Sequence, residues 1–253
     1  MATVPPTFRT AAVSPIEDVS EGWRRIRDVY WLFLGIACVG MLIGGFAPMG
    51  VLMGPMMCGI YGCYRHRFQG RPVRFEMLFE GFDTHTFVQS LLATLILMGV
   101  SFVVTFGIVI VGFVAALALG VSLAGKSGEP ASGLMATVMV LVLTTMMTLM
   151  IVVGTLFAFV YPLIVDRRMK GVEAVMLSVR AALANLGGLL GLSLVTFVMG
   201  LAGMCCCYVG AFFVMPISLA AHMVAYEQVF GLTAPSEQPQ LPRVADDVGK
   251  VEP

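Results

Sequence analysis

The chain has 253 residues, of which 58% are hydrophobic and 12% are charged, and its 15 Lys and Arg balance its 15 Asp and Glu. Soluble domains carry about 25% charged residues, so this composition excludes an ordinary soluble domain. A net charge of zero provides no bulk basic field, and nucleic acid is not an expected partner. We therefore expect an all-α integral membrane protein: a polytopic bundle of about six transmembrane helices with two or three interfacial amphipathic helices.

The N-terminal segment is polar. Residues 1–15 contain Pro5, Pro6 and Pro15 among small residues and predict a disordered arm. Because a long polar segment precedes the first apolar run, we expect no cleaved signal peptide. Residues 16–28 predict a helix with acidic residues early and basic residues late, the order that a helix dipole favours. This helix begins the predicted membrane domain, which covers residues 16–231.

The first two predicted spans cover residues 29–47 and 49–64. Gly40 and Gly44 give span 1 a small-residue face against which another helix can pack closely. Span 2 is short and is interrupted by Gly54 and Pro55. It crosses a thinned bilayer, extends into the following arginines by snorkelling, or is re-entrant. The distribution of basic residues favours a crossing.

The loop after span 2 is basic and then aromatic. Its phenylalanines and Leu78 recur at helical spacing and predict an amphipathic helix over residues 73–82 that lies on the membrane surface. We expect its basic residues to contact anionic lipid headgroups. These are Arg65, Arg67, Arg71 and Arg74.

Spans 3 and 4 are predicted over residues 87–124 and 131–165, which contain no Asp, Glu, Lys or Arg. Roughly 20 apolar residues cross a bilayer, and both segments are far longer. The helices must tilt, break at glycines such as Gly107 and Gly112, or project beyond the bilayer as an apolar hairpin. A projecting hairpin would need a partner to cover it.

A second surface helix is predicted over residues 171–185, after a packing or kink position at Pro162, with Arg167, Arg168 and Lys170 as further headgroup contacts. Spans 5 and 6 follow over residues 186–204 and 208–229. The remaining features expected to shape helix packing in these spans are Gly187, Gly191 and Pro216, of which the proline is expected to kink span 6. Residues 232–253 predict a disordered tail.

The basic residues predict an orientation. With six spans, every Lys and Arg except Lys126 falls on the same side of the membrane. The positive-inside rule then places both termini in the cytoplasm. Together with the resemblance described next, this predicts a multi-pass protein of the bacterial inner membrane.

Residues 161–230 resemble a group of uncharacterised bacterial multi-pass membrane proteins related to the membrane domain of some glycerophosphodiester phosphodiesterases. The features that carry the resemblance are Tyr161-Pro162 with Asp166, Glu173-Ala174 with Ser178, Pro216, and Ala225-Tyr226, preceded in the first half by Gly54-Pro55 with Gly59 and by residues 78–82. The resemblance implies a six-helix membrane fold. It implies no catalytic motif, because the phosphodiesterase activity belongs to a separate soluble domain.

Ionisable residues in or near spans are candidates for proton or ion coupling. His222 and Glu227 lie near the cytoplasmic end of span 6, but five positions apart and so not squarely on one helical face. Asp83 and His85 at the start of span 3 predict either a pH-sensitive pair or a helix start in the headgroup zone. The helix start is the favoured interpretation.

Soft-metal chemistry is the other candidate, because the chain has 19 methionines and a run of cysteines from Cys205 to Cys207. Thioethers and thiolates select Cu(I), but Met and Cys are also adaptable apolar fillers. Neighbouring cysteines seldom bridge each other easily. We expect no metal, no cofactor and no catalytic residues, since no nucleophile, phosphate-binding or zinc-ligand spacing is present.

The favoured function is therefore a non-enzymatic membrane scaffold that maintains the envelope or recruits a partner. Membrane lipids are the expected partners, with a homo-oligomer or another membrane protein as further alternatives. The second hypothesis is a small transporter or ion permeation pathway that uses the interrupted spans 2 and 6, since substrate sites in transporters often lie at discontinuous helices.

Overall fold

The computed structural model describes residues 8–10, 12–46, 50–124, 131–205 and 209–233. Within these residues the regular structure is all helical, as predicted, and no strand is present. The α-helices are α1 (Pro15–Ile26), α2 (Tyr30–Phe46), α3 (Met53–Phe68), α4 (Thr84–Ala124), α5 (Ala131–Leu156), α6 (Val160–Arg167), α7 (Gly171–Ala184), α8 (Leu186–Cys205) and α9 (Val209–Phe230), with 3-10 segments η1 (Arg27–Val29) and η3 (Phe75–Phe82).

Five helical segments within the described residues are long and apolar enough to cross a membrane. They are Pro15–Phe46, Thr84–Ala115, Ala136–Arg167, Leu186–Cys205 and Val209–Phe230. The predicted span 2 corresponds to α3, which has 16 residues and ends in a basic turn. Most of α3 is buried inside the protein, so its apolar side chains face other helices.

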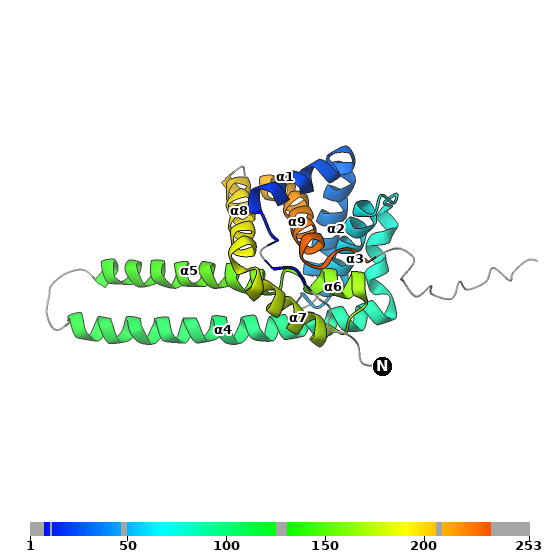
Figure 1. Ribbon diagram of the computed structural model, residues 1–253. Helices are drawn as coiled ribbons and strands as arrows, with labels where there is room; N and C mark the ends of the chain where they lie inside the picture. The colour runs from blue at the N-terminus through cyan, green and yellow to red at the C-terminus, as the bar shows by residue number, and fades with distance from the viewer. Residues whose placement is uncertain (1–7, 11, 47–49, 125–130, 206–208, 234–253) are drawn as a thin grey trace, which may run out of the picture.

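The molecule consists of a body and a projecting hairpin (Figure 1). α2, α8 and α9 belong to the body, whereas α4 and α5 run side by side away from it and across the direction of α8 and α9. α4 is one continuous helix of 41 residues, about 60 Å at 1.5 Å per residue. A Cβ on Gly112 would lie 2.6 Å from Val142, so α4 packs against α5 at this glycine without breaking there.

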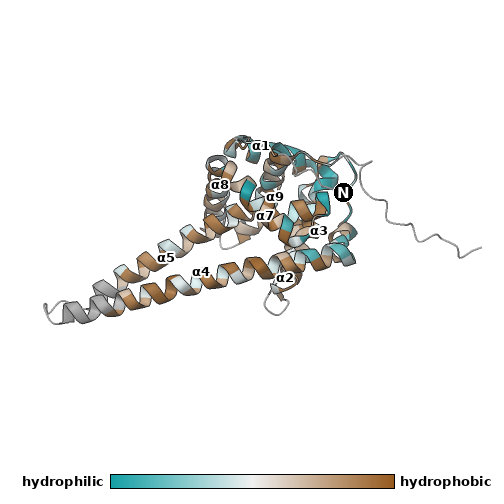
Figure 2. Cartoon of the chain, turned by 60° about the horizontal axis from the view of Figure 1, so that its bottom comes forward, coloured by the Kyte–Doolittle hydropathy of each residue, from teal (hydrophilic) through white to brown (hydrophobic). Residues whose placement is uncertain are grey.

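The hairpin differs from the body in polarity. Apolar colours predominate along α4 and α5, and hydrophilic residues gather on α1 and around α3 (Figure 2). Many large apolar side chains of the hairpin are exposed, including Phe102 at 68% and Leu141 at 66%. Of the alternatives left open by the sequence, a break at Gly107 or Gly112 is not found, because α4 runs continuously through both glycines.

The predicted span 4 is divided between α5 and α6. The chain turns at residues 157–159, and Ser178 of α7 satisfies backbone groups on both sides of the turn. Its hydroxyl donates to the Leu156 carbonyl at 2.9 Å and accepts from the Phe159 N–H at 3.2 Å. A break in a membrane helix is tolerated where neighbouring side chains satisfy the freed backbone groups, and one serine provides this here.

The predicted surface helix 73–82 is the 3-10 segment η3, and it packs tightly on α3. A Cβ on Gly59 would lie 1.8 Å from the Leu78 carbonyl oxygen, and one on Gly81 would lie 2.1 Å from the Pro55 carbonyl oxygen. Leu78 is fully buried, while Phe75, Phe79 and Phe82 remain exposed. One face of the segment is therefore buried in the protein core, and the other face exposes apolar side chains.

The predicted glycine faces serve packing within the chain, with one exception. Gly40 packs against Ile60 and Gly44 against Met53, which joins α2 to α3, and Gly54 meets Thr94 of α4. Gly191 packs against Pro15. Gly187 has no neighbour within 4 Å of a built Cβ, and the adjacent Gly188 makes the close contact, with the Val13 carbonyl oxygen at 2.4 Å.

The N-terminal arm is partly ordered. Of the residues expected to be disordered, 1–7 and 11 lie outside the described residues, as does the tail from residue 234. The Arg9 N–H donates to the Val229 carbonyl at 2.8 Å. The buried Asn185 donates to the Arg9 carbonyl at 3.0 Å and accepts from the Ala12 N–H at 3.2 Å. Asn185 thus holds the arm against the body.

Replacement of Gly59 by Ala should destabilise the protein by about 1–3 kcal/mol, because the new methyl group overpacks the contact between α3 and η3. Gly99 is the matched control: it is exposed on α4 with no neighbour within 4 Å of a built Cβ. Gly99→Ala should be neutral or stabilising by up to about 1 kcal/mol through helix propensity. Reversible unfolding in mixed micelles measures both changes, and equal stabilities would show that α3 and η3 are not interlocked.

Candidate functional site

A buried polar junction joins the ends of α3, α6 and α9. Arg65 Nε lies 2.8 Å from Asp166 Oδ1, with the two side chains 6% and 1% exposed. The Tyr226 hydroxyl donates to Asp166 Oδ2 at 2.9 Å, and the Thr233 hydroxyl donates to the same oxygen at 3.0 Å. Asp166 therefore receives a cation and two hydroxyl donors. Hydrogen bonding of this kind is what a buried ion pair requires to be tolerated.

A second group of polar contacts joins α1 to α3 and α9. Arg25 pairs with Glu227 of α9, and its guanidinium carbon lies 4.6 Å from the centre of the Phe68 ring. Arg67 pairs with Asp28. These contacts bring the charged ends of α1, α3, α6 and α9 to one region of the molecule.

The expected headgroup residues divide into two sets. Arg65 is buried, Arg67 pairs with Asp28, and Arg167 donates to the Phe230 carbonyl at 2.7 Å. The burial of Arg65 does not fit the expected lipid contact, whereas Arg67 and Arg167 are half-buried and bind other parts of the same chain, and their lipid contact stays a prediction. The remaining residues are Arg74 and Lys170, which are exposed, and Arg71 and Arg168, which are half-buried.

A cavity of about 620 Å³ lies where the base of the hairpin meets the body. It is lined from α3, α4, α5, α9 and the segment around α6, and its polar side chains include Ser101, Thr105, Ser218 and His222. Its methionines are Met57, Met146, Met147, Met150 and Met215.

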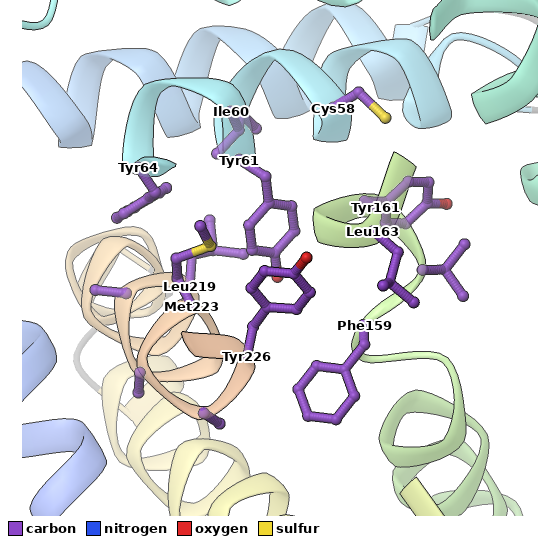
Figure 3. Close-up of a cluster of buried hydrophobic side chains, with 14 of the residues drawn as sticks. Cys58, Ile60, Tyr61, Tyr64, Phe159, Tyr161, Leu163, Leu219, Met223 and Tyr226 are labelled. Atoms are coloured by element: carbon purple, nitrogen blue, oxygen red, sulfur yellow. The ribbon is translucent and has the colours of Figure 1, made fainter. Parts of the chain in front are cut away.

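Tyr61 and Tyr161, which line the cavity, also belong to a cluster of buried side chains (Figure 3). Tyr61 extends from α3 toward α9, which carries Leu219 and Met223, and Tyr161 comes from α6 on the opposite side. The Tyr161 hydroxyl lies 3.2 Å from Thr94 Oγ1, whose own proton goes to the Ser90 carbonyl at 2.7 Å. The Tyr161 hydroxyl therefore donates to Thr94, which fixes this side chain at the cavity wall.

The structure separates the two candidate coupling residues of α9. His222 lines the cavity, and its Nδ1 lies 2.8 Å from the Ser218 carbonyl oxygen. Because a carbonyl only accepts, Nδ1 carries the proton and Nε2 is the acceptor of the neutral ring. Glu227 instead faces Arg25. The spacing of five positions places them on different faces of the helix.

Asp83 directly precedes α4, and His85 lies in the first turn of this helix. The Asp83 carbonyl accepts from the Phe87 N–H at 2.7 Å, and His85 is exposed. This geometry agrees with the favoured interpretation of a helix start.

The described residues offer no cluster of acidic, His and Cys side chains for a metal ion. The described residues contain no group of three or more His, Cys, Asp or Glu that could hold a metal ion. Cys205 is a free, exposed cysteine. Cys206 and Cys207 of the same run lie outside the described residues.

The fold and these sites define a class: an all-helical protein with several helices of membrane-spanning length, held together by a buried polar junction at one end and containing an apolar cavity. Comparisons with protein-family models, with curated proteins and with solved structures give no match.

Replacement of Asp166 by Asn should cost about 3–5 kcal/mol, because it leaves the buried Arg65 charge without its carboxylate. The double variant Arg65→Met/Asp166→Asn should recover most of that loss, since both charges are then gone. Asp28→Asn, which breaks the more exposed pair with Arg67, should cost less than about 1 kcal/mol. Unfolding in mixed micelles gives all three values, and equal costs for Asp166→Asn and Asp28→Asn would contradict the buried pair.

The environment of His66 should make the stability of the protein depend on pH. Burial lowers the pKa of His66 below its usual value of 6.5, and the charges of Arg65 and Arg71 lower it further. Between that lowered pKa and 6.5 the unfolded chain binds more protons, so stability should fall as the pH falls below about 6.5. His66→Gln should remove this part of the dependence. Unfolding of both proteins from pH 7.5 to 5 tests it, and parallel curves would refute the assignment.

Proposed function

We propose that this chain is a non-enzymatic multi-pass protein of the bacterial inner membrane that acts as a scaffold and recruits a membrane partner through the α4–α5 hairpin. The observation that carries the proposal is the projecting, apolar hairpin. An exposed apolar surface of this extent marks a protein–protein or membrane interaction site.

The length of the hairpin favours a protein partner over lipid alone. α4 is about 60 Å long, roughly twice the 30 Å of a hydrocarbon core, so lipid tails cover its full length only if it lies strongly tilted. Gly99 and Gly107 have no neighbour within 4 Å of a built Cβ, and Val103 between them is 69% exposed. Small residues on an outer face let another helix approach closely.

The proposed topology has six crossings, with α3 as the short one and both termini in the cytoplasm. The meeting of the charged ends of α1, α3, α6 and α9 supports it. η3 and α7 would lie at the cytoplasmic interface as amphipathic helices, where Arg74 and Lys170 bind anionic headgroups, each contributing roughly 1 kcal/mol. Exposed Phe79 and Met176 on these elements would enter the lipid.

A transporter or permeation pathway is the second candidate, and the cavity beside His222 is the observation that favours it. Residues of α3 and α9, which correspond to the interrupted spans 2 and 6, contribute to its lining. Its lining is mainly methionine, leucine and aromatic, however, and Glu227 is not part of it. A hydrophilic solute would find few hydrogen-bond partners there, so the scaffold remains the better supported function.

Site-specific photocrosslinking tests the recruitment. A benzophenone side chain replaces Phe106 or Phe113 on the hairpin, and Phe197 on α8 as the matched exposed control. In native membranes the hairpin positions should give a discrete adduct with one membrane protein or a second copy, identified by mass spectrometry, and Gly107→Leu should abolish it. Lipid adducts alone at the hairpin positions would contradict the recruiting role.

A further inference from the structure

We infer that the cavity at the base of the hairpin binds one long apolar chain that ends in a neutral hydroxyl group, as in a long-chain alcohol. The inference does not rest on the scaffold proposal, because it concerns the inner face of the hairpin and not its outer one.

The size of the cavity suits such a chain. Ligand pockets measure about 300–1,000 Å³, and this one measures about 620 Å³. A water molecule takes about 30 Å³ in the liquid and a methylene group takes a similar volume, so the space holds on the order of 20 such groups. Each methylene moved out of water contributes about 0.8 kcal/mol, which makes an apolar chain the favoured occupant over water.

The lining suits a flexible occupant. The lining includes Met146 and Met150 of α5, Met57 of α3 and Met215 of α9. Methionine is unbranched and adapts its rotamer to irregular apolar shapes, which is why it recurs at adaptable binding surfaces. A chain with many rotamers of its own can therefore be accommodated without a rigid matching shape.

The polar groups select the end of the chain. His222 donates from Nδ1 to the Ser218 carbonyl, so Nε2 of the neutral ring is a hydrogen-bond acceptor and favours a ligand O–H. Ser101 and Thr105 of α4 provide further hydroxyl groups at the lining. A buried polar group gains from a hydrogen-bond partner that an alkane cannot offer.

The absence of charge in the lining selects a neutral end. Among the described residues that line the cavity, none is Asp, Glu, Lys or Arg. A carboxylate or phosphate would lose its hydration there without gaining a counter-charge, which is costly. The acyl chain of a bilayer phospholipid shares the apolar part of this chemistry, but its phosphate would have to remain outside.

The test uses the purified full chain in lipid nanodiscs and three diazirine probes: a hexadecanol, the matching hexadecane and a phosphatidylcholine. Hexadecanol should label cavity residues such as Leu97 and Val153, at least about fivefold more than hexadecane, the factor that one net hydrogen bond of about 1 kcal/mol provides. Equal labelling by hexadecane, or cavity labelling by the phospholipid alone, would overturn the inference.

Two variants, Gly154→Leu and His222→Leu, change the lining of the cavity, and Gly99→Leu is their control. Gly154 lines it and has no neighbour within 4 Å of a built Cβ, so Gly154→Leu should obstruct part of it without a backbone clash and reduce hexadecanol labelling severalfold. Gly99→Leu, equally open but on the outer face, should leave labelling unchanged. His222→Leu should preserve labelling by hexadecane while removing the advantage of the alcohol. Unchanged labelling in Gly154→Leu would place the probe elsewhere and overturn the site.

A methionine control separates apolar volume from sulfur chemistry. Met146→Leu/Met150→Leu keeps the volume and polarity of the lining nearly constant, so hexadecanol labelling should persist. Loss of labelling in a variant that still folds, as judged by its unfolding midpoint, would show that the thioethers themselves are required. That result would contradict an apolar-chain site.

Discussion

The arrangement of the body depends on one buried ion pair. Arg65 is the first charged residue after the apolar part of α3, and Asp166 is the first after the long apolar run that forms α5 and α6. Each charge would be costly to bury alone. Paired with each other and bonded to Tyr226 and Thr233, they fix the ends of α3, α6 and α9 in register, and the pairs between α1 and its neighbours follow at the same end of the molecule.

From this fixed end, the rest of the architecture follows through the turn at Ser178. α6 must reach Asp166 in the body while α5 belongs to the hairpin, so the chain changes direction at residues 157–159. Ser178 makes this turn tolerable by bonding the backbone on both sides of it. Because the hairpin then crosses the direction of α8 and α9, helices diverge at its base. The apolar cavity lies there.

Much of the fold could be predicted from the sequence, because long uncharged segments and helical periodicity are local signals. The predicted spans correspond to α2, α3, α4, α5 with α6, α8 and α9, within a few residues. The partners of charged residues are not local. Arg65 follows an apolar run and so resembles a headgroup ligand, yet its counterion lies 101 positions away.

The candidate site was predictable only in part. Tyr226 and Ser178 are among the features of the family resemblance, but nothing in their spacing reveals what they bind. The position of His222 in a span marks it as a candidate, whereas most of the methionines that share its cavity lie on two other elements, α3 and α5. The contact between Gly59 and Gly81 likewise depends on an approach of two segments that no periodicity encodes.

The most direct test of the central ion pair is a solid-state NMR measurement in lipid bilayers. Arginine side chains labelled with ¹⁵N should dephase the signal of an aspartate carboxyl carbon, since Arg65 Nε lies 2.8 Å from Asp166 Oδ1. The effect should survive in Asp28→Asn, which removes the other Arg–Asp pair found among the described residues, and should vanish when Asp166→Asn is added. Absence of dephasing in the Asp28→Asn protein would contradict the buried pair on which this account rests.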